Sequence, residues 1–213
     1  MSLDNFINLL NPNERKLFSE FLTPADIQNF LDSFPYVSED LNRSPLRVMH
    51  DRQAHCLDGG LFAAAALWQI GYPPLILDLV PEPGVDDDHV LAIYRNDDLY
   101  GAVAKSNFSG LRFREPVYRS LRELVMSYFE GFFNVEGKKT LRAYTRPMDL
   151  RHYARCEWLW SEDGVEVVVE RLYRLKGIPV LNQESIAGLS PMDKRSYESG
   201  MLGVNYDGLY KPH

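Results

Sequence analysis

The segment from Cys56 to Ile70 constrains the fold more than any other part of this chain. Leucine, phenylalanine, tryptophan and a run of alanines at 63–66 leave it without a broad polar face. A helix that is apolar on every side has to be covered on every side. We therefore predict a central helix that other elements enclose, ended by the GYPP sequence at 71–74.

Three short sequences before this segment mark the starts of further helices. Each combines a polar residue that can cap a helix with a proline, which is favoured at the first helical position. The pairs are Asn11-Pro12, Thr23-Pro24 and Ser44-Pro45. Because apolar residues then recur at helical intervals, we predict amphipathic helices that pack against the central one.

After the central helix, short apolar runs typical of strands take over. They cover residues 75–80, 89–94 and 99–104, and the turn-forming sequence Asn96-Asp97-Asp98 separates the last two. We expect antiparallel strands here, with the last two forming a hairpin.

The second half of the chain carries weaker signals. We predict helices over 115–133 and 150–160, a strand over 138–144, a last helix from Ser190 and a loose tail from Gly200. Residues 166–175 suit either a strand or a helix. The expected fold class is α+β, in a single domain over residues 1–213. Within it we place an N-terminal helical extension at 1–44, a core at 45–135 and a C-terminal extension at 136–213.

Charge and composition narrow the classes of partner. A net charge of -7 argues against a nucleic-acid partner, because such affinity comes from lysines and arginines that neutralise phosphates. The first ten residues lack the features of a secretory signal, and no apolar run approaches the roughly 20 residues of a membrane span. We therefore expect a cytoplasmic protein without a membrane partner. The sequence does not indicate an oligomeric state.

The sequence gives no reason to expect a cofactor or a metal ion. Its two cysteines, Cys56 and Cys156, lie a hundred positions apart and have no metal-ligand spacing. The acidic sequence at 86–89, DDDH, cannot direct four adjacent side chains at one ion from an extended strand, where side chains alternate.

Cys56 is the candidate nucleophile. It opens the predicted central helix, and a helix N-terminus favours a thiolate by lowering the thiol pKa. Gly59 and Gly60 in the first turn each cost about 1 kcal/mol of helix propensity relative to alanine. They predict a close approach of a neighbouring strand or room for a substrate. The alternative for Cys56 is a small packing residue of the core.

His89 is the candidate base, because a thiolate nucleophile needs one and this histidine opens an apolar strand. If residues 96–98 form a three-residue loop, Asn107 lies diagonal to His89; with a two-residue loop, Ser106 takes that place. We prefer Asn107, whose side-chain carbonyl can accept the imidazole N–H and fix its tautomer.

The order of these features resembles the transglutaminase-like branch of the papain-like cysteine enzymes. The resemblance covers residues 45–110: a cysteine heading an alanine-rich buried helix, the GYPP break into a strand, and a histidine opening the next strand. It implies a papain/transglutaminase-like core in which the Cys-bearing helix packs on an antiparallel sheet. It also implies a nucleophile at Cys56, a base at His89 and an orienting residue at Asn107. Gln53, three residues before the cysteine, is either an oxyanion donor or a surface glutamine.

The resemblance predicts a cysteine-dependent acyl-transfer enzyme. Its expected activity is hydrolysis of a peptide-like amide bond through a Cys-His-Asn triad and a thioester, with a peptide or a small amide as the substrate. Most relatives of this kind carry aspartate as the third member, whereas residues 105–107 include no acid. The alternative is therefore a catalytically silent binding or scaffold module. An arylamine acetyl carrier is a third possibility, but no Arg-Gly-Gly sequence precedes Cys56.

Overall fold

One antiparallel sheet organises the molecule. The computed structural model describes residues 3–211, and its strands follow the order β4-β3-β2-β1-β5-β7, with β6 paired to β1 beside β5. The strands are β1 Leu75–Pro81, β2 His89–Asn96, β3 Leu99–Val103, β4 Arg114–Tyr118, β5 Leu141–Tyr144, β6 Met148–Asp149 and β7 Ile178–Pro179. The expected α+β class and the antiparallel sheet are confirmed.

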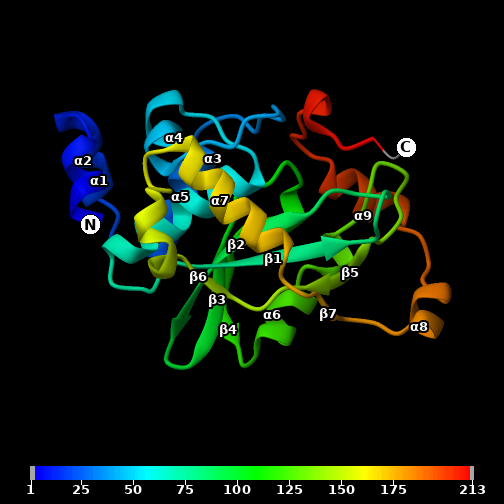
Figure 1. The fold of residues 1–213 in the computed structure, drawn as a ribbon. Coiled ribbons are helices and arrows are strands. Elements are labelled where there is room, and N and C mark those ends of the chain that lie inside the picture. Colours follow the sequence, from blue (N-terminus) through cyan, green and yellow to red (C-terminus); the bar gives the residue numbers. More distant parts are fainter. Residues whose placement is uncertain (1–2, 212–213) are drawn as a thin grey trace.

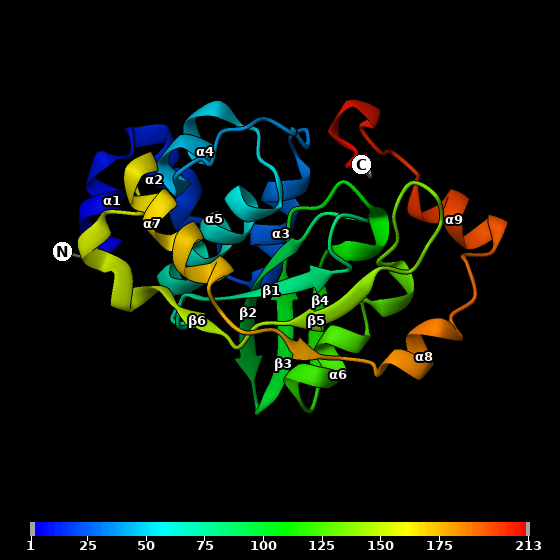
Figure 2. The same cartoon turned by 45° about the vertical axis from the view of Figure 1, so that its right-hand side comes forward.

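Helices cover both faces of this sheet (Figures 1 and 2). The α-helices are α1 Leu3–Leu9, α2 Pro12–Ser19, α3 Pro24–Asp32, α4 Pro45–Asp51, α5 Cys56–Gln69, α6 Leu121–Met126, α7 Glu162–Tyr173, α8 Gln183–Ala187 and α9 Lys194–Gly200. Short 3-10 turns are η1 Ser109–Leu111, η2 Phe129–Gly131, η3 Leu150–Cys156 and η4 Tyr206–Gly208. Among the described residues, no helix is long and apolar enough to cross a membrane.

The three predicted capping pairs start helices as expected. The side chains of Asn11, Thr23 and Ser44 accept hydrogen bonds from backbone N–H groups in the first turns of α2, α3 and α4. These bonds satisfy donors that a helix start otherwise leaves free. Local sequence therefore sets these three boundaries.

The enclosed helix is α5, and every residue from Cys56 to Leu67 is buried. The two glycines of its first turn allow backbones to come close. A Cβ at Gly59 would lie 2.2 Å from Cβ of Lys105, and one at Gly60 would lie 2.8 Å from Cγ1 of Val90. Neighbouring chain therefore fills the space that the glycines leave.

The two faces of the sheet bury separate sets of apolar side chains. On β2, Val90 and Ala92 face the cluster around α5, while Leu91 and Ile93 face the cluster around α6 and η2. This follows from the alternation of side chains along a strand. Which face a residue takes decides what it can contact.

Two segments differ from their predictions. Residues 115–133 form β4, α6 and η2 instead of one helix, because β4 pairs with the edge of β3 and Ser120 starts a new helix by capping Glu123 N–H. The helix predicted at 150–160 is the shorter 3-10 segment η3. The ambiguous segment at 166–175 falls mostly within α7, where valines at helical spacing are buried.

The sheet extends beyond the expected core at 45–135. β5 pairs with β1, and β7 pairs with β5, so strands that follow residue 135 continue the same sheet. Residue 135 therefore does not mark an edge of the sheet.

Candidate functional site

The thiol of Cys56 lies at the N-terminus of α5 against the first residues of β2. Its Sγ is 3.8 Å from the carbonyl oxygen of Asp88, and the backbone of Val90 lies beside it. The side chain of Tyr36 lies beside Cys56, and both residues border the same cavity. Only 7% of the residue is exposed.

Burial raises the pKa of the Cys56 thiol well above its usual value, and the carboxylates of Asp88, Asp87 and Asp78 raise it further. The helix N-terminus favours the thiolate, as the sequence predicts, but the surrounding negative charge opposes it. In this environment the sulfur is a protonated thiol at neutral pH.

His89 lies on the opposite face of the sheet from Cys56. It pairs with Leu79 in the ladder, and its Nε2 is 2.7 Å from the carbonyl oxygen of Leu111; both leucines belong to the cluster around α6. Burial lowers the pKa of His89 to about 4. In this segment the backbone of its two neighbours, Asp88 and Val90, lies beside the thiol.

The hairpin has the shorter of the two loops that the sequence allows. Asn96 pairs with Leu99, and the intervening Asp97 and Asp98 have φ angles of 46° and 68°. Such a two-residue turn matches the twist of the strands. The preferred three-residue register is therefore wrong; continued past the end of β3, the observed one places residue 106 opposite residue 89.

Asn107 is bonded to the C-terminal segment. Its amide donates to the carbonyl of Asn205 and accepts the N–H of the same residue, both at 2.8 Å. We expected the imidazole of His89 to donate to the Asn107 side-chain carbonyl; instead its Nε2 is bonded to the Leu111 carbonyl. Asn107 and His89 do line one small cavity, together with Ser106. Catalytic roles for Cys56, His89 and Asn107 remain predictions.

Gln53 lies between the end of α4 and the start of α5, half-buried. Within residues 3–211 its side chain has no hydrogen-bond partner. Its role as an oxyanion donor remains a prediction.

Four residues near the thiol were not singled out from the sequence as candidates of their own. Asp88 lies beside Tyr173 of α7, and Tyr36 lies beside the thiol. Asp78 lies on the same face of β1, opposite Val90. The alternation of side chains along a strand would have pointed to Asp88, which lies two residues before Val90. Tyr36 and Tyr173 come from segments distant in the sequence, and no sequence pattern links them to the thiol.

Asp88, Tyr36 and Tyr173 border a groove of about 330 Å³ that Cys56 also lines, which we call the groove at Cys56. Its charged lining consists of Glu39, Asp40, His55, Asp87 and Asp88. His55 caps α5 and is held at 3.2 Å by both Asp58 and the carbonyl of Leu41. Within residues 3–211, no cluster of three or more histidines, cysteines or acidic residues could hold a metal ion.

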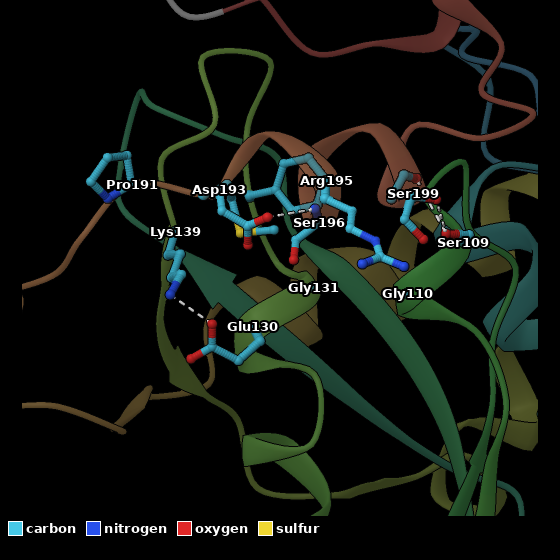
Figure 3. Close-up of a pocket in the computed structure, with 13 residues that line it drawn as sticks. Ser109, Gly110, Glu130, Gly131, Lys139, Pro191, Asp193, Arg195, Ser196 and Ser199 are labelled. Carbon is cyan, nitrogen blue, oxygen red and sulfur yellow. Dashed lines mark hydrogen bonds and ion pairs between the residues drawn. The ribbon is translucent and has the colours of Figure 1, made fainter.

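A larger cavity of about 510 Å³ lies elsewhere, between the turns η1 and η2 and the segment at 191–200 (Figure 3). Lys139 pairs with Glu130 at 2.6 Å on one side of it, and Arg195 extends on the other. None of its lining residues borders the groove at Cys56. This cavity and the thiol therefore do not form one site.

Comparisons with known proteins give distant matches only. No family model matches the chain, and no curated protein does. Among solved structures, the chain is similar to Legionella pneumophila LapG, EGTA-treated, with 15% identity over 50% of this chain and 70% of that one, at a TM-score of 0.36. Two further LapG structures match at the same TM-score. One has 15% identity and the calcium-bound one 14%; both cover 50% of this chain, and 71% and 72% of theirs.

Proposed function

We propose that this protein is a binding module in which Cys56 does not act as a nucleophile with His89. One observation carries the proposal: the imidazole of His89 is bonded to the Leu111 carbonyl in the cluster around α6, whereas the charges that act on the thiol are carboxylates. A module of this kind retains the helix and sheet of a thiol enzyme and uses the groove at Cys56 to receive a ligand.

The charges around the sulfur support this proposal. A thiolate nucleophile needs a nearby base and benefits from positive charge, whereas carboxylates here raise the thiol pKa. His89 has its Nε2 bonded to the Leu111 carbonyl, on the far side of β2. Proton transfer requires hydrogen-bond contact or one bridging water, and within residues 3–211 the thiol and His89 bond to separate backbone carbonyls.

A cysteine-dependent acyl-transfer enzyme is the second candidate. The position of Cys56 at the head of α5, in the lining of a groove, favours it. The expected reaction is hydrolysis of a peptide-like amide through a thioester, with Asn107 orienting His89. This candidate requires His89 to reach the thiol from the opposite face of the sheet.

The rate of iodoacetamide labelling at Cys56 separates the two candidates. It is measured against pH in a Cys156→Ser background, so that Cys56 is the one thiol that can be labelled. For a binding module we expect slow labelling that rises only at alkaline pH and is the same in His89→Ala. Asp88→His, which places an imidazole on the thiol face, should label faster at pH 7.

Labelling that is rapid well below pH 8 and disappears in His89→Ala would contradict the binding module and support the enzyme. Circular dichroism of each variant shows whether a change in labelling reflects the site or a loss of fold.

A further inference from the structure

We propose that the C-terminal segment at 201–211 is a strap that controls entry to the groove at Cys56 through Tyr36. This inference rests on the proposed binding function and concerns its regulation. The segment follows α9 and runs along the outside of the molecule (Figures 1 and 2). Tyr36 lines three hollows: the groove at Cys56, the small cavity beside His89, and a hollow of about 370 Å³ beside Lys105.

The segment contacts both the backbone and the ring of Tyr36. The side chain of Asn205 donates to the Tyr36 carbonyl at 3.0 Å, and an added Cβ at Gly208 would lie 3.2 Å from Cδ1 of the Tyr36 ring. Gly208 also lines the cavity beside His89, whose volume of about 40 Å³ has room for ordered water but not for a large side chain. While the segment is in place, the phenol ring therefore cannot rotate towards it.

The segment is attached in a way that allows it to leave. Within 201–211 the one buried side chain is that of Val204, and neither apolar cluster includes it. Leu202 and Tyr206 are 79% and 69% exposed. Three hydrogen bonds hold Asn205 to the rest of the chain, and such bonds contribute little net stability where water replaces them. Release of the segment therefore leaves the core clusters intact.

A hinge at Gly203 separates the segment from an anchored helix. α9 ends against the core, because an added Cβ at Gly200 would lie 2.5 Å from Cζ of Phe133. Gly203 has a φ of 76°, which glycine adopts without strain, and an added Cβ there would meet nothing within 4 Å. Rotation about this residue therefore displaces the rest of the segment while α9 stays in place.

Release of the segment changes the surroundings of the thiol. Tyr36 lies beside Cys56 and borders the same groove. The groove and the cavity beside His89 share part of their linings, namely Tyr36, Asp87 and Asp88. Once the segment withdraws, the phenol ring can rotate into the space that it leaves, and reagents and ligands reach Cys56 more readily.

The test is the rate of iodoacetamide labelling at Cys56 in the full chain with Gly208→Val, at pH 8 in the Cys156→Ser background. A valine at 208 crowds the Tyr36 ring, because even its Cβ would lie at 3.2 Å, so the segment loses its seat. Overpacking of one contact typically disfavours the packed state by a factor of about ten or more, and we expect labelling to be faster by about that factor. Amide exchange at 201–211 shows whether the segment has left.

Asn205→Ala is a milder second variant for the case in which the valine disturbs the fold. It removes the hydrogen bonds of this side chain to the Tyr36 carbonyl and the Asp207 N–H and adds no bulk. We expect labelling about fivefold faster, the effect of about one neutral hydrogen bond. Gly188→Val is the control, because an added Cβ at Gly188 meets ordinary contacts at 3.7 Å and Gly188 does not line the groove.

Unchanged labelling of Gly208→Val with the segment released would overturn the inference, and so would equal acceleration in Gly188→Val. A segment that stays protected from exchange in Gly208→Val would also overturn it, because its seat would not be the one described. These results compare rates at one pH, whereas the binding module is judged by the pH profile and by His89→Ala in the intact chain. Either proposal can therefore fail while the other stands.

Discussion

At the scale of single residues, the charge of Asp88 opposes ionisation of the Cys56 thiol. Asp88 and His89 are adjacent in the sequence, yet the His89 imidazole is bonded to the Leu111 carbonyl in the cluster around α6, whereas the carboxylate of Asp88 raises the pKa of the thiol. A carboxylate at that position opposes ionisation of the thiol, whereas a histidine would support it.

The ionised form of Asp88 should also cost stability. Burial, with the charge of Asp87, raises the pKa of Asp88 from 3.8 to about 6. The folded state therefore binds this proton more tightly than the unfolded state does. Above pH 6 the residue is ionised in both states and destabilises the fold; as the pH falls from 6 towards 4, the cost disappears.

We predict that Asp88→Asn raises the free energy of unfolding at pH 8 by about 1–3 kcal/mol, an upper range set by the size of the pKa shift. The gain should shrink through pH 6 and vanish near pH 4. Urea unfolding at these three pH values measures it, with Asp97→Asn as the control. A gain that is independent of pH would show that charge is not its cause.

At the scale of elements, helix α5 is held by close approach as well as by apolar burial. Gly59 contributes by lacking a Cβ, because the added atom would lie 2.2 Å from Cβ of Lys105. No rotation of a side chain relieves a contact between two Cβ atoms, so the backbone itself has to shift.

We predict that Gly59→Ala destabilises the fold by about 2–3 kcal/mol, although alanine is the better helix former by about 1 kcal/mol. Gly188→Ala is the control, since an added Cβ there meets only ordinary contacts at 3.7 Å. Denaturant unfolding of both variants gives the difference. If Gly59→Ala were stabilising, helix propensity would outweigh the close approach.

The N-terminal helices complete the same core. Phe62 of α5 stacks on Phe30 at 5.0 Å between ring centroids and meets Phe18 and Phe21 edge-on. Residues 18–30, which the sequence placed in an extension, thus pack directly against α5. The helices of this extension are too short to be stable without that contact.

Phe62→Ala should therefore cost about 3–5 kcal/mol, the range for a large aromatic removed from a packed core. Leu22→Ala, at a position that is 78% exposed, should cost little. Thermal unfolding with both variants checks the difference. Similar losses at the two positions would mean that these phenylalanines are not packed as the structure describes.

The features that the sequence predicts correctly are those formed by interactions between residues close together in the chain. The caps at Asn11, Thr23 and Ser44 act within one helical turn, and the all-apolar run of α5 demands enclosure wherever it lies; both predictions hold. The register of the hairpin depends on whether its loop has two or three residues. An error of one residue in the loop length replaces Ser106 by Asn107 as the residue predicted beside His89. The pairing of β5 with β1 joins distant segments and has no local signal.

At the scale of the whole molecule, the C-terminal segment at 201–211 forms hydrogen bonds to two residues distant in the chain, Asn107 and Tyr36. Asn205 bonds to the Asn107 amide through its backbone, and its own side chain donates to the carbonyl of Tyr36 at 3.0 Å. Gly208 packs against the ring of Tyr36, where an added Cβ would lie 3.2 Å away. The segment therefore packs against a residue that lies beside the thiol.

Asn107→Ala should loosen this segment without unfolding the core. It removes two hydrogen bonds, worth about 1 kcal/mol each, while the apolar clusters on both faces of the sheet keep their contacts. We expect faster amide exchange at 201–211 and faster cleavage near Tyr206, which is 69% exposed, with unchanged protection in α5. Asn42→Ala, which removes a hydrogen bond to Glu166, is the control for a lost amide elsewhere. Exchange that increased equally in α5 would mean that Asn107 stabilises the core itself, and unchanged exchange at 201–211 would mean that packing on Tyr36 alone holds the segment.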